Sequence, residues 1–329
     1  MSSDRPIRSV HHPRRGAWRL GWGTAAVAVV LAVGGCATTA PTASTPATAG
    51  SAGSGGARVV TVAASINAWG SIAAQLGGTH VRETSIITNP DTDPHAYEPT
   101  PADGRTIAGA QLVVVNGVGY DPWAGKAVAA NPNPARTVLD VGDLTGTPDG
   151  GNPHRWYSPA DVEKVADAIT ADLKKADPGD AAYFDTQRQS FDTTGLATYH
   201  QLINDIKTTY AGTPVGASES IFSPLAQALG LNLITPPSFL QAISEGSDVS
   251  AADKTTIDHQ IATKALTVYV FNAQNSTPDV AAQVQACKDR GIPVSAVTET
   301  LAPAGASFQD WQSAQLKDLR TALHQATGK

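Results

Sequence analysis

The sequence of 329 residues has only two cysteines, Cys36 and Cys287, and a single methionine. Two thiols are too few for a disulfide framework or for a four-thiolate zinc site. Basic residues are also scarce: 23 of them face 29 acidic residues, which gives a net charge of -6. The chain therefore has no basic character for binding the phosphate backbone of a nucleic acid, and no nucleic-acid partner is expected. Its length fits a soluble globular protein of two domains.

The first 35 residues predict an export signal. Residues 1–19 carry five arginines against one aspartate, and residues 20–35 carry no charge. This uncharged run has 16 residues, fewer than the roughly 20 that a membrane-spanning helix needs. A basic segment followed by a short apolar one is typical of a cleaved signal peptide, here residues 1–35.

Small residues precede Cys36 in the run Leu31-Ala32-Val33-Gly34-Gly35-Cys36. This run resembles the lipobox of bacterial lipoproteins, in which the cysteine is lipid-modified and becomes the mature N-terminus. The alternative is that Cys36 is a small buried residue. Residues 37–57 contain no charged and no large apolar side chain, so residues 36–57 are expected to form a flexible tether.

From residue 58 onward, short β-rich runs alternate with helical patterns, which indicates βαβ units and the α/β fold class. We expect two α/β lobes, residues 58–178 and 211–329, each with βα repeats around a central sheet. The predicted strands are 59–64, 81–87, 112–116, 137–141, 214–217, 266–271 and 293–297. The predicted helices are 67–76, 159–175, 222–229, 277–289 and 310–326.

Between the lobes, aromatic and aliphatic residues recur at helical spacing from Tyr183 to Tyr210. The simplest interpretation is one long rigid helix over 179–210, about 45 Å in length, that joins the lobes and fixes their relative position. The cleft between the lobes is then the default binding place.

Two segments contain a Pro-His step, Pro94-His95 and Pro153-His154. Prolines around His95 hold it in non-helical backbone after a predicted strand, and a stiff loop at the carboxyl end of a strand suits a metal ligand. One loop histidine alone is more often structural, but two such steps favour a shared role. The remaining histidines of the exported part are interpreted as surface or capping residues: His80, His200, His259 and His324.

With these motifs, residues 58–329 resemble the zinc and manganese substrate-binding lipoproteins of metal ABC transporters, known as cluster A-I or cluster 9. The resemblance is carried by Pro94-His95-Ala96-Tyr97-Glu98-Pro99-Thr100, by Leu112-Val113-Val114-Val115-Asn116-Gly117 followed by Trp123, and by Pro153-His154-Arg155-Trp156-Tyr157-Ser158-Pro159. It implies a metal ion held in the interlobe cleft by four side chains.

The resemblance assigns His95 and His154 as the ligands of the first lobe. Glu219, in Ala217-Ser218-Glu219-Ser220-Ile221-Phe222, matches the third position, although a glutamate there can also serve only to stabilise a helix N-terminus. Glu299 stands where the family usually has aspartate. It could chelate through both oxygens, bind in a shifted position, leave coordination to water, or be a solvated loop charge.

Two imidazoles and two carboxylates suit Mn(II), Zn(II) or Fe(II) and not Cu(I), which prefers sulfur. Residues 96–153 contain no histidine, whereas zinc-dedicated members of the family commonly have a histidine-rich loop there, so manganese is favoured. Cys287 falls on one helix face with Val280 and Val284, which predicts a buried apolar role. Trp156 and Tyr157 are expected to pack within the lobes.

We therefore expect a monomeric binding protein, not an enzyme, with no catalytic cofactor. It would capture Mn2+ or Zn2+ on the outer face of the bacterial cytoplasmic membrane and deliver the ion to an ABC permease with its ATPase. One alternative is a secreted zinc-dependent hydrolase. The sequence contains no His-Glu-x-x-His motif, which argues against this alternative. Another is a surface adhesin with a structural metal. Capture should weaken as the pH falls through the range near 6.5, in which histidines become protonated.

Overall fold

The structure is a computed structural model that describes residues 59–329 except 91, 93–96 and 276. All of these belong to the second, Ser54–Lys329, of the two units into which the chain divides. The predicted signal peptide (1–35), the tether (36–57), Cys36 and His95 lie outside the described residues.

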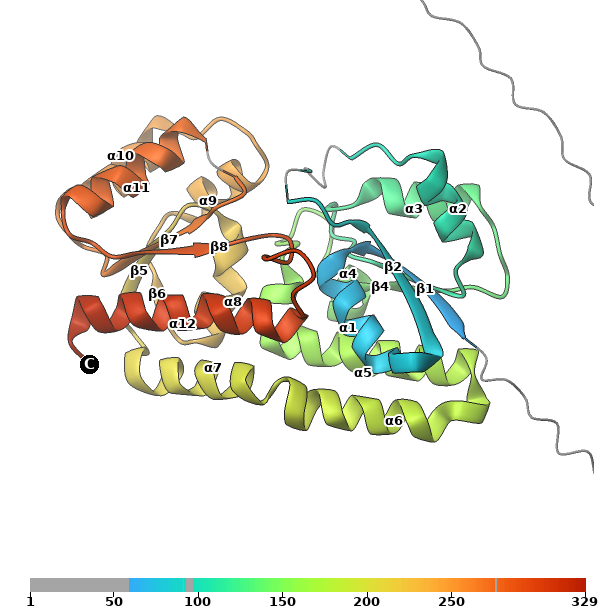
Figure 1. The fold of residues 1–329 in the computed structure, drawn as a ribbon. Helices are drawn as coiled ribbons and strands as arrows, with labels where there is room; N and C mark the ends of the chain where they lie inside the picture. The colour runs from blue at the N-terminus through green and yellow to red at the C-terminus, as the bar shows by residue number, and fades with distance from the viewer. Residues whose placement is uncertain (1–58, 91, 93–96, 276) are drawn as a thin grey trace, which may run out of the picture. The chain divides into compact units, whose positions relative to one another are not determined.

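Two four-stranded parallel sheets form the centres of two lobes (Figure 1). The first sheet has the order β2-β1-β3-β4 and consists of β1 (Val60–Ile66), β2 (Val81–Ile87), β3 (Leu112–Val115) and β4 (Thr137–Asp140). All four residues of β3 are buried. A continuous apolar strand is what a parallel sheet with both faces covered requires.

The second sheet repeats this arrangement with the order β6-β5-β7-β8. It consists of β5 (Pro214–Ala217), β6 (Asn232–Leu233), β7 (Val268–Asn272) and β8 (Val294–Val297), all paired in parallel. The prediction of two α/β lobes is confirmed. In sheets of this kind, the loops that leave the carboxyl ends of the central strands are the usual place for a ligand.

The helices of the first lobe are α1 (Asn67–Gly77), α2 (Pro101–Gly109), α3 (Pro122–Ala130), α4 (Val141–Thr145) and α5 (Pro159–Ala176). Those of the second lobe are α8 (Ser223–Ala228), α9 (Pro237–Ser244), α10 (Ala251–Ala262), α11 (Pro278–Asp289) and α12 (Phe308–Thr327). Short 3-10 turns are η1 (Gly78–His80), η2 (Arg155–Tyr157), η3 (Pro178–Asp180) and η5 (Ser220–Phe222).

Local sequence explains where the long helices begin. The Ser158 side chain accepts a hydrogen bond from the backbone N–H of Asp161, and Pro159 occupies the first turn of α5. Ser307 caps α12 in the same way, through the N–H of Asp310. Such caps satisfy backbone donors that have no partner within the helix.

The connection between the lobes differs from the prediction of one uninterrupted helix. It consists of α6 (Ala181–Ser190), the π-helical turn η4 (Phe191–Gly195) and α7 (Ala197–Tyr210). The N–H of Leu196 donates to the carbonyl of Phe191 at 2.7 Å, so the α-helical hydrogen-bond pattern is broken at this point. Gly195 and the two threonines before it are weak helix formers, which allows the wider turn.

Contacts tie this connection to both lobes. Helix α6 packs against α5 and α1, whereas α7 packs against α12, as Figure 1 shows along one side of the two sheets. The lobes also touch directly, since the Tyr157 hydroxyl lies 2.8 Å from the Thr298 carbonyl and 2.7 Å from Gln315 Oε1. Trp156 and Tyr157 are fully buried, which confirms their packing role.

In the part of the chain that the structure describes, no helix combines the length and the apolar character needed to cross a membrane.

Candidate metal centre

Three of the four side chains predicted to bind a metal come together in the structure. Glu219 follows β5 and Glu299 follows β8, both in the second lobe, whereas His154 directly precedes η2 in the first lobe. One nitrogen of His154 and one oxygen of each glutamate lie within 4.8 Å of one another. His95, the fourth predicted ligand, lies outside the described residues.

His154 is held in a fixed orientation. It is 2% exposed, and its Nδ1 lies 3.0 Å from Asn152 Oδ1 and 3.5 Å from Ser220 Oγ. An amide oxygen can only accept a hydrogen bond, so Nδ1 carries the proton in this contact and Nε2 keeps the basic lone pair. Hydrogen bonding of the remote ring nitrogen is how proteins usually orient a metal-binding histidine.

The two glutamates share one amide group. Asn272, the last residue of β7, donates from Nδ2 to Glu219 Oε1 at 2.5 Å and to Glu299 Oε1 at 2.8 Å. Asn275 donates to Glu219 Oε2 at 2.7 Å, and the Tyr120 hydroxyl donates to Glu299 Oε2 at 2.8 Å. Every carboxylate oxygen of the pair therefore accepts a hydrogen bond from a neutral donor.

The electrostatics of the pair favour a cation. Burial of Glu219, which is 1% exposed, and then the nearby charge of Glu299 raise the pKa of Glu219 to about 8, although the hydrogen bonds from Asn272 and Asn275 act in the opposite direction. Burial and the charge of Glu299 also raise the pKa of Tyr120. A buried carboxylate this close to a second, partly buried one is stabilised by a proton or a positive ion.

Two observations bear on the alternatives that the sequence left open for the two glutamates. Glu219 precedes a 3-10 turn, but its side chain makes no capping hydrogen bond there. Glu299 is partly buried and accepts hydrogen bonds from Tyr120 and Asn272, so it is not a solvated loop charge.

Sequence reasoning missed the donors around the ligands: Tyr120, Asn152, Asn272 and Asn275. A signal for two of them was present. Asn272 directly follows one predicted strand and Tyr120 lies a few residues after another, so both belong to the edge of the sheet at which ligands gather. Cys287, by contrast, lies fully buried in α11, as expected, and burial raises the pKa of its thiol to about 12.

A cavity of about 370 Å³ lies beside two residues that contact His154. Val118 and Asn152 from the first lobe line it, together with Ser220, Leu240 and Ser244 from the second. Asn152 and Ser220 also contact His154. The cavity therefore lies where the two lobes meet, next to residues that contact His154.

The profile of the family described as zinc-uptake complex component A, periplasmic (ZnuA), matches residues 62–322. Among curated proteins, the chain is 24% identical over 183 residues to the manganese-binding lipoprotein MntA of Halalkalibacterium halodurans, covering 53% of this chain and 59% of the relative. It is 28% identical over 140 residues to the iron-binding protein YfeA of Yersinia pestis, covering 41% and 44%. The chain thus spans less than two thirds of the length of these relatives.

Among solved structures, the Cd-bound periplasmic metal binding protein from Candidatus Liberibacter asiaticus has a similar fold, with a TM-score of 0.67 and 18% identity over 80% of this chain and 99% of that chain. The profile match spans most of the chain, and the two-lobe fold agrees with it. The chain therefore belongs to the ZnuA family of periplasmic zinc-uptake components.

Proposed function

We propose that this protein is an extracytoplasmic solute-binding protein that captures a divalent transition metal, Mn2+ or Zn2+, and delivers it to an ABC permease with its ATPase. The observation that carries the proposal is the convergence of His154, Glu219 and Glu299 from two lobes, with ligand atoms within 4.8 Å of one another. His95 is the proposed fourth ligand.

The donor set fits this cargo. Two carboxylates balance the charge of a divalent ion, and neutral imidazoles add the borderline ligands that Mn(II), Fe(II) and Zn(II) accept. The relatives are named for manganese and iron, and the family for zinc. We propose manganese as the transported ion, although nitrogen and oxygen ligands bind Zn(II) more tightly than Mn(II).

Capture and release follow from the hydrogen bonds of the carboxylates. An ion at the cluster replaces the proton held at Glu219, and Glu299 turns from the Tyr120 hydroxyl toward the ion. Direct contacts between the lobes, such as that of Tyr157 with Thr298, restrict the rearrangement to the loops that carry the ligands. Release to the permease reverses these steps when the loops move apart.

Both carboxylates of the cluster serve as ligands in this mechanism. Within the described residues, the cluster of His154, Glu219 and Glu299 contains no third acidic group that could act as a general base. The site is therefore suited to carrying an ion and not to hydrolysis with metal-bound water.

Export and anchoring complete the proposal. The signal peptide would direct the chain across the cytoplasmic membrane, and acylated Cys36 would hold it on the outer face through the tether of residues 36–57. Replacement of Cys36 by alanine tests this step, because the variant should appear in the soluble extracytoplasmic fraction while the wild type stays with the membrane.

The test of metal capture uses the purified chain without a polyhistidine tag, stripped of metal and then equilibrated with equimolar Mn(II), Zn(II) and Fe(II). Bound metal is measured in the wild type, in His154→Ala and in Glu299→Ala. We expect each variant to hold one ion per chain fewer than the wild type. His259→Ala, which alters an exposed histidine on α10, is the matched control and should retain every ion.

A wild-type protein that retains no metal would contradict the proposal. Unchanged metal content in both ligand variants would place the ion elsewhere in the molecule.

A further inference from the structure

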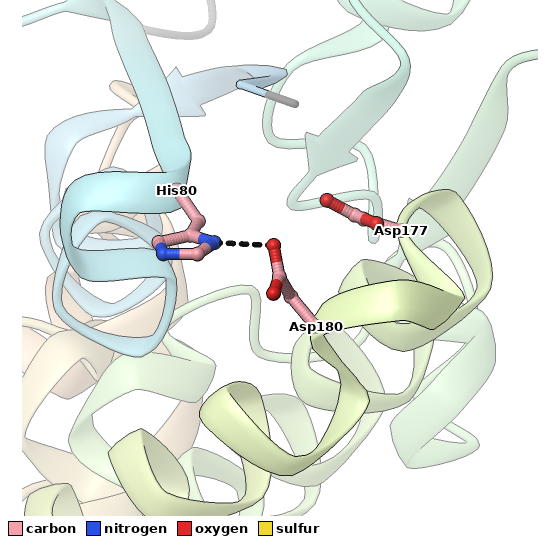
Figure 2. Close-up of side chains that lie close together, drawn as sticks. All are labelled: His80, Asp177 and Asp180. Carbon is pink, nitrogen blue, oxygen red and sulfur yellow. Dashed lines mark hydrogen bonds and ion pairs between the residues drawn. The ribbon is translucent and has the colours of Figure 1, made fainter. Parts of the chain in front are cut away.

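A second cluster of metal-binding side chains lies away from the cleft. It consists of His80 at the end of η1 and of Asp177 and Asp180 at the corner between α5 and α6 (Figure 2). One ligand atom from each residue lies within 4.8 Å of the other two. The interlobe cluster shares no residue with it.

The local sequence brings the two carboxylates together. Asp177-Pro178-Gly179-Asp180 forms a tight 3-10 turn, in which the N–H of Asp180 donates to the carbonyl of Asp177 at 3.3 Å. His80 Nδ1 lies 2.7 Å from Asp180 Oδ2. The imidazole also stacks on Tyr183, with ring centroids 4.0 Å apart and planes at 22°, so its orientation is fixed.

Asp177 is the unexplained member of the cluster. It is only 8% exposed, and its Oδ2 is buried without a hydrogen-bond partner. No lysine or arginine of the described residues forms an ion pair with Asp177 or Asp180. A buried carboxylate oxygen without a partner is costly, and a cation beside it removes that cost. In Figure 2 the Asp177 carboxylate extends toward His80 and Asp180.

We propose that His80, Asp177 and Asp180 bind a second divalent cation. One imidazole and two carboxylates suit Zn(II), Mn(II) or Fe(II), and the two carboxylates balance the charge of the ion. The ion takes the place of the proton between His80 Nδ1 and Asp180, and it satisfies the buried oxygen of Asp177. Water completes the coordination on the more exposed side, where Asp180 lies.

This site is separate from the interlobe cluster. Helix α1 has 11 residues and is therefore about 16 Å long. Its first residue, Asn67, accepts a hydrogen bond from the N–H of Leu301, near Glu299, whereas its last residue adjoins η1 and His80. The second ion joins the turn after α1 to the start of α6, and so has a stabilising role in the first lobe.

The test uses the full-length chain without a polyhistidine tag and Zn(II) as the probe. In the variant Glu219→Gln/Glu299→Gln, in which the interlobe cluster has lost its charged ligands, we expect one Zn(II) per chain after equilibrium dialysis. Adding Asp177→Asn should remove this ion. Adding Asp185→Asn instead, which changes a more exposed aspartate of α6, should leave it bound.

Thermal unfolding supplies a second measurement. Zinc should raise the unfolding temperature of Glu219→Gln/Glu299→Gln and leave that of the same protein with Asp177→Asn unchanged. The single variant Asp177→Asn should still bind the interlobe ion, and this binding would show that the variant folds. If the variant does not fold, Asp180→Asn replaces Asp177→Asn in the test.

A zinc content that is equal with and without Asp177→Asn would overturn the second site. The interlobe proposal would stand in that case, because it is tested separately by His154→Ala and Glu299→Ala.

Discussion

The two lobes have the same strand order but contribute different chemistry to the cleft. The first lobe supplies the imidazole of His154 and the phenol of Tyr120. The second supplies both carboxylates, and Asn272 and Asn275 as amide donors to them. The repeated topology determines where the loops meet, whereas the residues on each loop determine which ion can bind. The acidic half of the cluster therefore belongs to one lobe alone.

If the second lobe supplies both charged ligands, removal of one carboxylate should have the largest effect on metal affinity. We expect Glu219→Ala to lower the affinity for Zn(II) by more than about 100-fold, because loss even of an outer partner of a metal ligand typically costs 10–100-fold. Competition with a chromophoric chelator measures the affinity. Asp289→Ala, which changes an exposed aspartate at the end of α11, is the control, and an equal loss there would contradict the assignment.

The second prediction concerns pH. Burial and Glu299 raise the pKa of Glu219 from 4.5 to about 8. Between these values the folded, metal-free protein binds more protons at Glu219 than the unfolded chain, so its free energy of unfolding falls as the pH rises. We expect the wild type to lose on the order of 2 kcal/mol between about pH 5 and pH 8 relative to Glu219→Gln.

Urea unfolding of both proteins at a series of pH values checks this expectation. Parallel curves for the wild type and Glu219→Gln would show that the carboxyl group titrates normally in the folded state.

The third prediction separates the amides of the second lobe from each other. Asn272 bridges both glutamates, whereas Asn275 donates to Glu219 and to the Ile243 carbonyl but not to Glu299. We expect Asn272→Ala to lower metal affinity about tenfold, in the range known for groups that orient ligands, and Asn275→Ala to lower it less. Calorimetric titration with Mn(II) measures both, and a reversed order would place the main support of the carboxylates at Asn275.

The smallest effect is expected for a contact between the lobes that does not involve the metal ligands. In Tyr157→Phe the buried contacts with Thr298 and Gln315 are lost, which should lower the free energy of unfolding by about 1 kcal/mol. The number of bound ions should stay the same. Tyr183→Phe is the comparison variant, because it removes a hydroxyl outside the lobe interface. The partners of this hydroxyl, Thr79 and Gln187, belong to the first lobe and its connecting helix.

Much of the fold could be predicted from the sequence because buried parallel strands form continuous apolar runs. β2 and β5 have the predicted limits, and the other predicted strands differ by one or two residues. The sequence did not predict β6, α2, α3, α4, α9 and α10. In α10 only Ile257 and Ile261 are buried, which leaves almost no periodic pattern. The π-helical turn was missed because Phe191 within it and Tyr199 after it are both buried, as in a continuous helix.

The candidate site was predicted in part for a similar reason. Loop glutamates and Pro-His steps stand out in a sequence, whereas the role of Asn272 depends on the pairing of β7 with β8, which sets Asn272 beside Val297. His80 was interpreted as a surface or capping residue, but in the structure it is mostly buried and paired with Asp180, 100 positions away. Local pattern contains no information on such a distant partner.

The π-helical turn between α6 and α7 has a mechanical consequence. Helix α7 has 14 residues and is therefore about 21 Å long. A lever of that length converts a rotation of about 5° at the turn into a displacement of about 2 Å at its far end, which is close to the length of a metal–ligand bond. The direct contacts of Tyr157 with Thr298 and Gln315 oppose such a rotation, so they hold the far end of α7 in place although the turn interrupts the helix.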